Sequence, residues 1–235
     1  MNGPRHAAVV AFHGDKPPVL AAFLTSTQRL LADLLGEAFV PRPVRWVHST
    51  VIGLDSLEPL GAGAPVLALD GGRPGPDWRE LCGFLREALS PDAAPRGPLS
   101  LQLGGFTPAE TSLRSRGRSL HERSLVVDRG QVVLVGWPVG GGRPVDRLDA
   151  LRREAGRLGF VHRYPLTDGA TDPDAHLVVG ELAGESAEDL SRARALLAGR
   201  PCRVPLTVQD LAIVVYDDPR LPEDSTERLR VADVC

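Results

Sequence analysis

The same five-residue pattern occurs twice in this chain, each time downstream of a histidine-bearing apolar segment. Residues 98–102 read Pro-Leu-Ser-Leu-Gln and residues 205–209 read Pro-Leu-Thr-Val-Gln, so apolar and polar positions match one by one. His48 lies 50 residues before the first pentapeptide, and His176 lies 29 residues before the second. The difference of 21 residues is about the length of a Gly- and Pro-rich segment at 58–76. We therefore predict a duplicated unit with an insertion in its first copy.

The periodicity of apolar residues supports a duplication, because both halves alternate between short apolar runs and helically spaced apolar positions. Strands are expected at residues 7–12, 45–54, 99–103, 124–128, 131–137, 175–181 and 204–216. Helices are expected at residues 18–38, 77–89, 145–158 and 187–197. The predicted fold class is α+β, with two pseudo-symmetric β-α-β-α-β lobes whose antiparallel-rich sheets face a central cleft. Residues 1–235 then form one bilobal domain, with units at about 7–106 and 131–216 and the insertion at about 58–76.

Composition and charge exclude several classes of protein. The chain is 43% hydrophobic and 24% charged, which is ordinary for a globular domain. Its formal net charge is −3, whereas domains that bind duplex DNA are usually basic, so duplex DNA is not an expected partner. It has neither an apolar run of about 18 residues nor a signal-peptide pattern, so we expect no membrane partner. Reduced cysteines in a cytoplasmic protein are expected, and so is a monomer. The three cysteines form no CxxC pair, and no metal or cofactor is expected.

Each histidine-bearing strand is expected to present its histidine on a face separate from its buried apolar residues. Residues two apart in a strand point to the same side. Val47 and Val51 then pack against a helix, while His48 and Thr50 face the space between the lobes. His48 and Thr50 lie about 7 Å apart along the strand, so one can move a proton while the other binds a phosphoryl oxygen. The predicted sets are Trp46, His48, Thr50 and Ile52 on the first strand and His176, Val178 and Gly180 on the second.

The segment His48-Ser49-Thr50-Val51 resembles the H-x-[ST]-hydrophobic motif of the two-histidine (2H) phosphoesterase superfamily. That superfamily includes RNA 2′,3′-cyclic phosphodiesterases and bacterial 2′-5′ RNA ligase-like proteins. Its members have two pseudo-symmetric lobes, each with a central motif strand that faces a shared cleft. The resemblance implies that His48 and His176 are catalytic: one activates a water or a ribose hydroxyl, and the other protonates the leaving oxygen. It also implies that Thr50 binds the phosphate and that no metal takes part.

The second motif departs from the family pattern at the phosphate-binding position. The segment His176-Leu177-Val178-Val179 has a valine where serine or threonine is expected. Val178 therefore lacks a hydroxyl, and a hydrogen bond to a charged oxygen is worth about 1.5–3 kcal/mol.

Two functions consequently remain open on this sequence. The first is a phosphoesterase, of the cyclic phosphodiesterase class, that hydrolyses a cyclic phosphate or a 2′-5′ phosphodiester in a nucleotide or at an RNA terminus. The alternative is a non-catalytic nucleotide- or RNA-binding protein of the same fold that has lost turnover. A biosynthetic enzyme that uses this scaffold on a non-nucleotide substrate is a third reading.

Three further residues are candidate substrate contacts. Trp46 shares the face of His48 and is placed to stack on a base, with core packing as an equal alternative. Arg116 belongs to an arginine-rich stretch at residues 114–123, which either grips a substrate phosphate or is a solvated loop. His162 either borders the cleft or lies at a strand edge.

Other polar residues near these strands have no predicted role. His6 and His13 flank the first strand without an identifiable partner. Asp168, Asp172 and Asp174 precede His176 closely, but they have the pattern of turn-forming residues.

Overall fold

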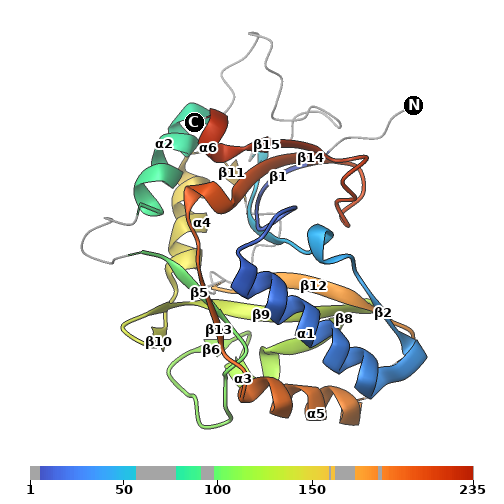
Figure 1. The fold of residues 1–235 in the computed structure, drawn as a ribbon. Coiled ribbons are helices and arrows are strands. Elements are labelled where there is room, and N and C mark those ends of the chain that lie inside the picture. The colour runs from blue at the N-terminus through green and yellow to red at the C-terminus, as the bar shows by residue number, and fades with distance from the viewer. Residues whose placement is uncertain are drawn as a thin grey trace.

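The computed structural model describes residues 6–56, 78–90, 98–158, 160–161, 173–184 and 187–234. The described chain is a mixed α+β fold with antiparallel sheets, as the sequence predicts (Figure 1). The helices are α1 (Pro18–Leu35), α2 (Trp78–Ala88), α3 (Leu120–Arg123), α4 (Arg147–Arg157), α5 (Ala187–Ala198) and α6 (Val231–Val234). The four long helices begin and end close to their expected bounds. The predicted insertion at 58–76 lies outside the described residues.

One four-stranded antiparallel sheet, called sheet A below, carries the first histidine motif at its edge. Its strand order is β15 (Glu227–Arg230), β14 (Leu211–Tyr216), β1 (His6–Ala11) and β3 (Ser49–Gly53). A 3-10 turn at Val44–Trp46 precedes β3, so the strand expected from residue 45 begins only after His48. β3 is therefore an edge strand in the described sheet, not the central strand that the resemblance implies.

A second antiparallel sheet, called sheet B below, carries the second motif on an interior strand. Its order is β13 (Cys202–Pro205), β5 (Ser100–Leu103), β9 (Gln131–Gly140), β12 (Ala175–Leu182) and β2 (Phe39–Pro41), with β8 (Leu125–Asp128) and β10 (Arg143–Pro144) alongside β9. β8 and β9 form the expected hairpin. Two further sheets have two short strands each. One pairs β4 (Asp55–Ser56) with β11 (Phe160–Val161), and the other pairs β6 (Arg114–Ser115) with β7 (Arg118–Ser119).

The two sheets do not correspond to the two halves of the chain. β1 from the first half pairs with β14 from the second, and β5 pairs with both β9 and β13. The expected boundaries at 7–106 and 131–216 therefore do not separate one sheet from the other. Alternating apolar residues determine which face of a strand is buried, but they do not determine which strand becomes its neighbour.

The two matching pentapeptides occupy different elements. Residues 98–102 lead into β5, whereas residues 205–209 span the end of β13 and a 3-10 turn at Val208–Asp210. The backbone N–H and the hydroxyl of Thr207 donate to the Asp210 carboxylate over 2.9 Å and 2.8 Å, which stabilises the turn. The single strand expected at 204–216 is therefore split between sheet B and sheet A. The pentapeptide match is not a structural equivalence.

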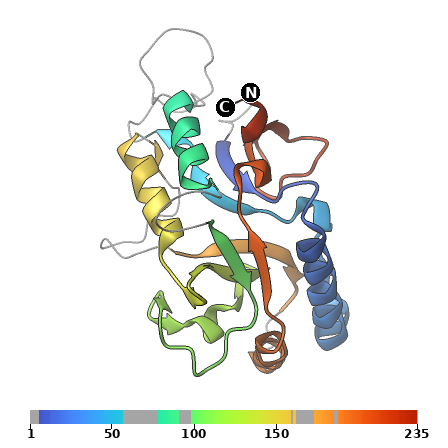
Figure 2. The same cartoon turned by 60° about the vertical axis from the view of Figure 1, so that its left-hand side comes forward.

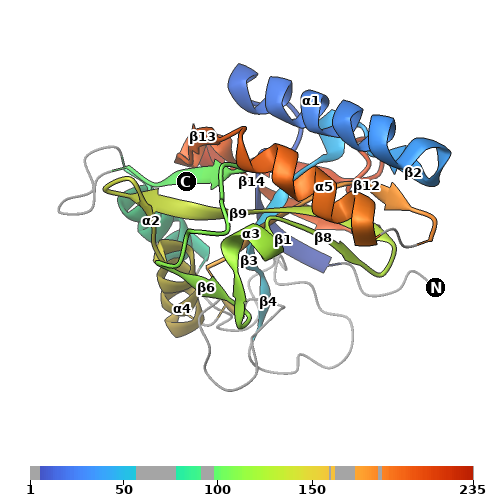
Figure 3. The same ribbon diagram turned by 90° about the horizontal axis from the view of Figure 1, so that it is seen from below.

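Helices close the core on one side of each sheet. α1 and α5 pack together against sheet B, while α2 and α4 lie together away from them (Figure 2 and Figure 3). Buried residues from both sheets and all four long helices form one cluster, the common core, which includes Leu24, Leu85, Leu151 and Leu197. Two smaller clusters lie on the opposite faces of the sheets. They consist of Ala8, Val10, Ala212, Val214 and Leu221 on sheet A, and of Phe106, Leu120, Val133, Val135 and Trp137 on sheet B.

Candidate functional site

Both histidine motifs run into a β-bulge at the same distance from the histidine. The pairing of β3 with β1 slips by one residue, so that Val51 is an extra residue on β3. The pairing of β12 with β9 slips in the same way, so that Val179 is an extra residue on β12. Each of these valines is the third residue after its histidine. A bulge re-aims the side chains around it, and this shared irregularity relates the two motifs structurally.

The bulges correct the predicted residue faces. After each bulge the alternation is inverted, so Ile52 and Gly180 leave the face of their histidine and turn toward the common core. Ile52 is fully buried there. At Gly180 a Cβ atom would lie only 2.4 Å from a ring carbon of Phe39, so the bulged strand needs glycine at this position.

A buried polar side chain holds each bulge. The Arg152 guanidinium, from α4, donates to the carbonyl oxygens of Val51 over 3.0 Å and Thr50 over 3.1 Å. The Gln28 amide, from α1, donates to the carbonyl oxygen of Val179 over 2.8 Å. Each of these side chains donates to backbone carbonyl groups that the irregular strand pairing leaves without a partner. Both bulges are therefore part of the folded core.

Before the bulges, the motif side chains lie on the sheet faces turned away from the common core. Thr50 pairs with Val10, a member of the small cluster on sheet A. Val178 packs against the small cluster on sheet B. The two motif strands are also neighbours in space, because Cα atoms of β3 and β12 come within 8 Å of each other although the strands belong to different sheets.

His48 is held as a neutral imidazole. Its Nδ1 lies 2.8 Å from the carbonyl oxygen of Trp46, which can only accept, so Nδ1 carries the hydrogen and Nε2 keeps its lone pair. Burial is the main reason why the pKa of His48 falls from 6.5 to about 4. The hydrogen bond to Trp46 opposes this change, and positive charge at His13, Arg42 and Lys16 adds to it. His48 is therefore in its basic form at neutral pH.

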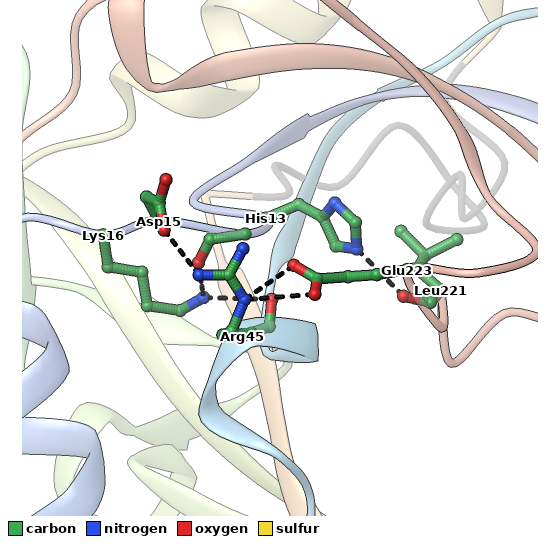
Figure 4. Close-up of polar contacts among 7 residues, drawn as sticks. His13, Asp15, Lys16, Arg45, Leu221 and Glu223 are labelled. Atoms are coloured by element: carbon green, nitrogen blue, oxygen red, sulfur yellow. Dashed lines mark hydrogen bonds and ion pairs between the residues drawn. The ribbon is translucent and has the colours of Figure 1, made fainter.

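His13 packs directly against His48. The two ring centroids are 6.0 Å apart in an edge-on arrangement. The Nε2 atom of His13 lies 2.9 Å from the carbonyl oxygen of Leu221, which joins the end of β1 to the segment after β14 (Figure 4). His13 reaches this position because the chain turns sharply at Phe12, whose φ is 64°.

Charged side chains surround this pair of histidines. Lys16 Nζ donates to the carbonyl oxygens of Gly14 over 3.1 Å and Arg45 over 3.4 Å (Figure 4). The Arg45 guanidinium in turn forms ion pairs with both nearby carboxylates, with Asp15 over 2.6 Å and with Glu223 over 2.9 Å. Both carboxylates are thus engaged by one arginine, and Lys16 has only carbonyl partners within the described part of the chain.

Arg42 adds a further cation next to both motifs. Its backbone N–H donates to the carbonyl oxygen of Val179 over 3.0 Å, and its positive charge lowers the pKa of His48. The residue is only 6% exposed, and its Nη2 atom has no hydrogen-bond partner in the part of the chain that the structure describes. Burial lowers the pKa of this guanidinium as well.

His176 lies in a different electrostatic setting, next to a buried carboxylate. Its Nε2 is 3.5 Å from Asp174 Oδ2 and 3.4 Å from Arg123 Nη2. When Nε2 carries a hydrogen it donates to Asp174, and when it does not it accepts from Arg123. The His176 side chain is 41% exposed, whereas that of Asp174 is 1% exposed. The imidazole is thus accessible from solvent while its partner is not.

Asp174 is the centre of a buried hydrogen-bond network. Besides His176 it accepts from Ser115 Oγ over 2.6 Å, Arg123 Nη2 over 2.9 Å and Trp137 Nε1 over 2.6 Å. Burial alone would raise the pKa of Asp174, but the hydrogen bonds from His176, Ser115 and Arg123 outweigh it and hold the pKa well below its usual value. Asp174 is therefore ionised and fixes the position of its donors.

The three residues predicted as substrate contacts, Trp46, Arg116 and His162, lie in different settings. Trp46 is partly buried, and it is its carbonyl group that contacts His48. Arg116 is exposed at the turn of the β6–β7 hairpin, with φ of 49°. Among the arginines of that stretch it is Arg123 that reaches His176. His162 lies outside the described residues.

Two residues near the histidines have no role in the sequence-based prediction. The position of Asp174 beside His176 could have been predicted from the sequence, because residues two apart in a regular strand share a face. The position of His13 beside His48 could not have been predicted, because it follows the end of β1 and depends on the turn at Phe12.

The described residues include neither a cluster of metal-ligating side chains nor a helix suited to crossing a membrane. They contain no group of three or more His, Cys, Asp or Glu side chains placed to hold a metal ion. Among the described helices, none combines the length and apolar character that a membrane crossing requires.

Comparisons with known proteins give a weak structural likeness. No family model and no curated protein matches this chain. Among solved structures, TT0787 of Thermus thermophilus matches over 95% of this chain and 93% of its own, with 14% identity and a TM-score of 0.42. The conserved protein of unknown function ATU0111 from Agrobacterium tumefaciens matches over 93% of this chain and 83% of its own, with 15% identity and a TM-score of 0.43. A likeness at this level does not indicate a function.

Proposed function

We propose that this chain is a metal-independent phosphoesterase that hydrolyses a cyclic phosphate or a 2′-5′ phosphodiester in a nucleotide or RNA. The observation that supports it is the pair of histidine motifs, each followed at the same distance by a bulge and each on a sheet face turned away from the common core. The resemblance of His48-Ser49-Thr50-Val51 to the 2H phosphoesterase motif points to the same chemistry.

The surroundings of the two histidines favour different roles, since acid and base are best distinguished by environments that differ in charge. His48 is neutral and has a lone pair on Nε2, so it is the general base that removes a proton from water. His176 is the general acid: the Asp174 carboxylate accepts its Nε2–H, which leaves the Nδ1–H of the protonated imidazole as the proton to be donated. As the water oxygen bonds to phosphorus, one ribose O–P bond breaks and the leaving oxygen takes the proton of His176.

Phosphate binding is unequal on the two sides of this arrangement. Thr50 offers a hydroxyl donor on the His48 side, while Val178 offers none on the His176 side. The cation nearest to that side is Arg123, whose Nη2 lies 3.4 Å from His176 Nε2, but its guanidinium is buried and paired with Asp174.

The alternative function is a nucleotide- or RNA-binding protein without turnover. One observation favours it: Val178 is partly buried and packs against the small cluster of Val133, Val135 and Trp137, as a structural residue would. The phosphoesterase is the better supported of the two, because a binding protein does not need an exposed imidazole beside a buried carboxylate.

The test is hydrolysis of a panel of 2′,3′-cyclic nucleotides and short 2′-5′-linked RNAs in the presence of EDTA. We expect turnover that survives EDTA, and loss of most of it in both His48→Ala and His176→Ala. The two losses should not add in the double variant, because the pair acts as a unit. His6→Ala, at the start of β1 and outside both motifs, is the matched control and should retain activity.

Two results would reject the proposal. Nucleotide binding without turnover supports the binding protein instead. Turnover that requires an added divalent metal contradicts the two-histidine mechanism.

A further inference from the structure

The face of sheet A that carries Thr50 ends in two arginines at its opposite edge. On β15, Arg228 pairs with Val214 and Arg230 pairs with Ala212. Residues directly opposite each other in an antiparallel pair share a face. Because Val214 and Ala212 belong to the small cluster on sheet A, both arginines lie on the face of Thr50.

Lys16 and His48 are anchored to the same turn. Lys16 Nζ donates to the carbonyl oxygen of Arg45, and His48 Nδ1 donates to the carbonyl oxygen of the next residue, Trp46. The ammonium group is thus fixed beside the imidazole through consecutive carbonyl groups of one 3-10 turn. Its positive charge contributes to the lowered pKa of His48, which agrees with this proximity.

Arg228 approaches the same place from β15. A Cβ atom built on Gly14 would lie 2.3 Å from Arg228 Nη1, so the guanidinium rests against the backbone of Gly14. Lys16 Nζ donates to the carbonyl oxygen of that same Gly14. Gly14 has φ of 79°, a conformation that glycine adopts readily, and the missing side chain leaves room for the arginine.

Neither cation forms an ion pair with a carboxylate among the described residues, although the charges of Asp15 and Glu223 act on both. The nearby carboxylates of Asp15 and Glu223 both bond Arg45. No hydrogen bond or ion pair joins the Arg228 side chain to another residue within the described part of the chain. Burial together with the charges of Arg45 and Arg228 lowers the pKa of Lys16 to about 7. Arg45, Lys16 and Arg228 thus share two carboxylates, and an excess of positive charge of this kind favours a bound anion.

We propose that Lys16 and Arg228 form an anion subsite beside His48 that binds a phosphate dianion, either a second phosphate of the substrate or free inorganic phosphate. An anion between the two cations accepts hydrogen bonds from the N–H groups of Arg228 and Lys16 that have no acceptor among the described residues. The subsite itself stands on the geometry above. Only the identity of its anion as a substrate phosphate rests on the proposed function.

The test uses the fact that Lys16 is the only lysine in the chain. Incorporation of 13C-labelled lysine gives one Cε resonance, whose pH titration is followed by NMR in the full-length protein. One sample contains inorganic phosphate and the reference contains sodium chloride at equal ionic strength. We expect a midpoint near pH 7 in chloride, close to the pKa of Lys16 of about 7. In phosphate it should rise by about one unit, a tenfold change in proton affinity.

Variants identify the second cation. Arg228→Gln should reduce the phosphate-dependent shift to less than half, and Arg228→Lys should restore part of it. Arg86→Gln, on α2, is the matched control and should keep the full shift. Equal midpoints in phosphate and chloride overturn the proposal, as does a shift that Arg228→Gln leaves intact.

A kinetic comparison distinguishes the two sources of phosphate. A 2′,3′-cyclic nucleotide with a 5′-phosphate is compared with the same nucleotide without it. A kcat/KM ratio of about five or more that falls in Arg228→Gln identifies a second substrate phosphate. A ratio near one, together with the phosphate shift, identifies free inorganic phosphate as the ligand. A phosphate shift without any turnover supports the subsite and rejects only the proposed function.

Discussion

The imidazole of His13 lies edge-on against that of His48, with ring centroids 6.0 Å apart and an interplanar angle of 75°. Burial lowers the pKa of both residues, and each imidazole, when charged, would oppose protonation of the other. At neutral pH both are therefore uncharged. The positive charge beside the first motif comes instead from Arg42, and from Lys16 in those molecules in which this residue, with its pKa of about 7, is protonated.

Stability should fall as the pH is lowered from about 6.5 toward 4. The folded state lowers the pKa of His48 from 6.5 to about 4, so the unfolded chain binds a proton first. The stability associated with neutral His48 is complete above pH 6.5 and is lost as the pH falls through this range. Urea unfolding at several pH values measures it. His48→Gln should flatten the dependence, while His6→Gln should not. A wild-type slope in both His48→Gln and His13→Gln contradicts the explanation.

The pH dependence of catalysis should share this origin. If His48 is the general base, the acidic limb of kcat/KM for a 2′,3′-cyclic nucleotide lies near pH 4, close to the pKa of His48 of about 4 and well below 6.5. Lys16→Met removes a positive charge and should move that limb to higher pH. A limb between pH 6 and 7 in the wild-type protein would be evidence against His48 as the buried base.

Val178→Thr introduces, in nearly the same volume, the residue type that the 2H phosphoesterase motif has at this position. We expect activity to rise or at least to be preserved, because a hydroxyl bound to a charged oxygen contributes about 1.5–3 kcal/mol. The new hydroxyl lies next to Val133, so the rate should be expressed per folded protein, with folding followed by circular dichroism. Val178→Ile, which adds volume without a hydroxyl, is the control. Equal inactivity of wild type and Val178→Thr, with nucleotide still bound, favours the binding protein.

Asp174→Asn should damage both the fold and the second motif. Asp174 and Arg123 form an ion pair with side chains 1% and 10% exposed, and removal of one charge leaves the other buried without a partner. Such changes usually lower the free energy of unfolding by about 3–5 kcal/mol. The variant should also lose activity at temperatures where it is folded, because His176 loses its negatively charged acceptor. Asp128→Asn, at the exposed end of β8, should leave stability and activity unchanged.

Periodicity predicted the long helices and the β8–β9 hairpin, since both depend on local spacing and local turns. Periodicity did not predict which strands are neighbours in a sheet, because that depends on pairing between distant parts of the chain. The partner of β1 is β14, from the other half of the chain, and no local pattern specifies that choice.

The candidate site was predicted only in part for a similar reason. The motif residues His48, Thr50, His176 and Val178 were located by their pattern. Ile52 was assigned to the wrong face because a strict period of two was extended through a bulge. The bulge depends on the buried Arg152, from a helix far along the chain, so it has no signal in the motif itself.

Gly180→Ala tests the second bulge directly. With Val179 as an extra residue, position 180 faces the common core, and a Cβ atom there lies 2.4 Å from the Phe39 ring and 2.6 Å from the carbonyl oxygen of Val40. The ring can shift, but the backbone oxygen cannot move without disturbing β2. Overpacking of this kind lowers the free energy of unfolding by about 1–3 kcal/mol.

Gly83→Ala is the matched control for this measurement. Gly83 is an exposed glycine inside α2, and a Cβ atom there meets nothing within 4 Å. Alanine should leave stability unchanged or raise it by up to about 1 kcal/mol, because it is the better helix former. Urea unfolding compares both variants with the wild-type protein. If strict alternation continued past Val178, position 180 would share the face of His176 and would not meet Phe39. Similar stabilities of Gly180→Ala and Gly83→Ala would therefore contradict the bulge and return Gly180 to the face that periodicity alone predicts.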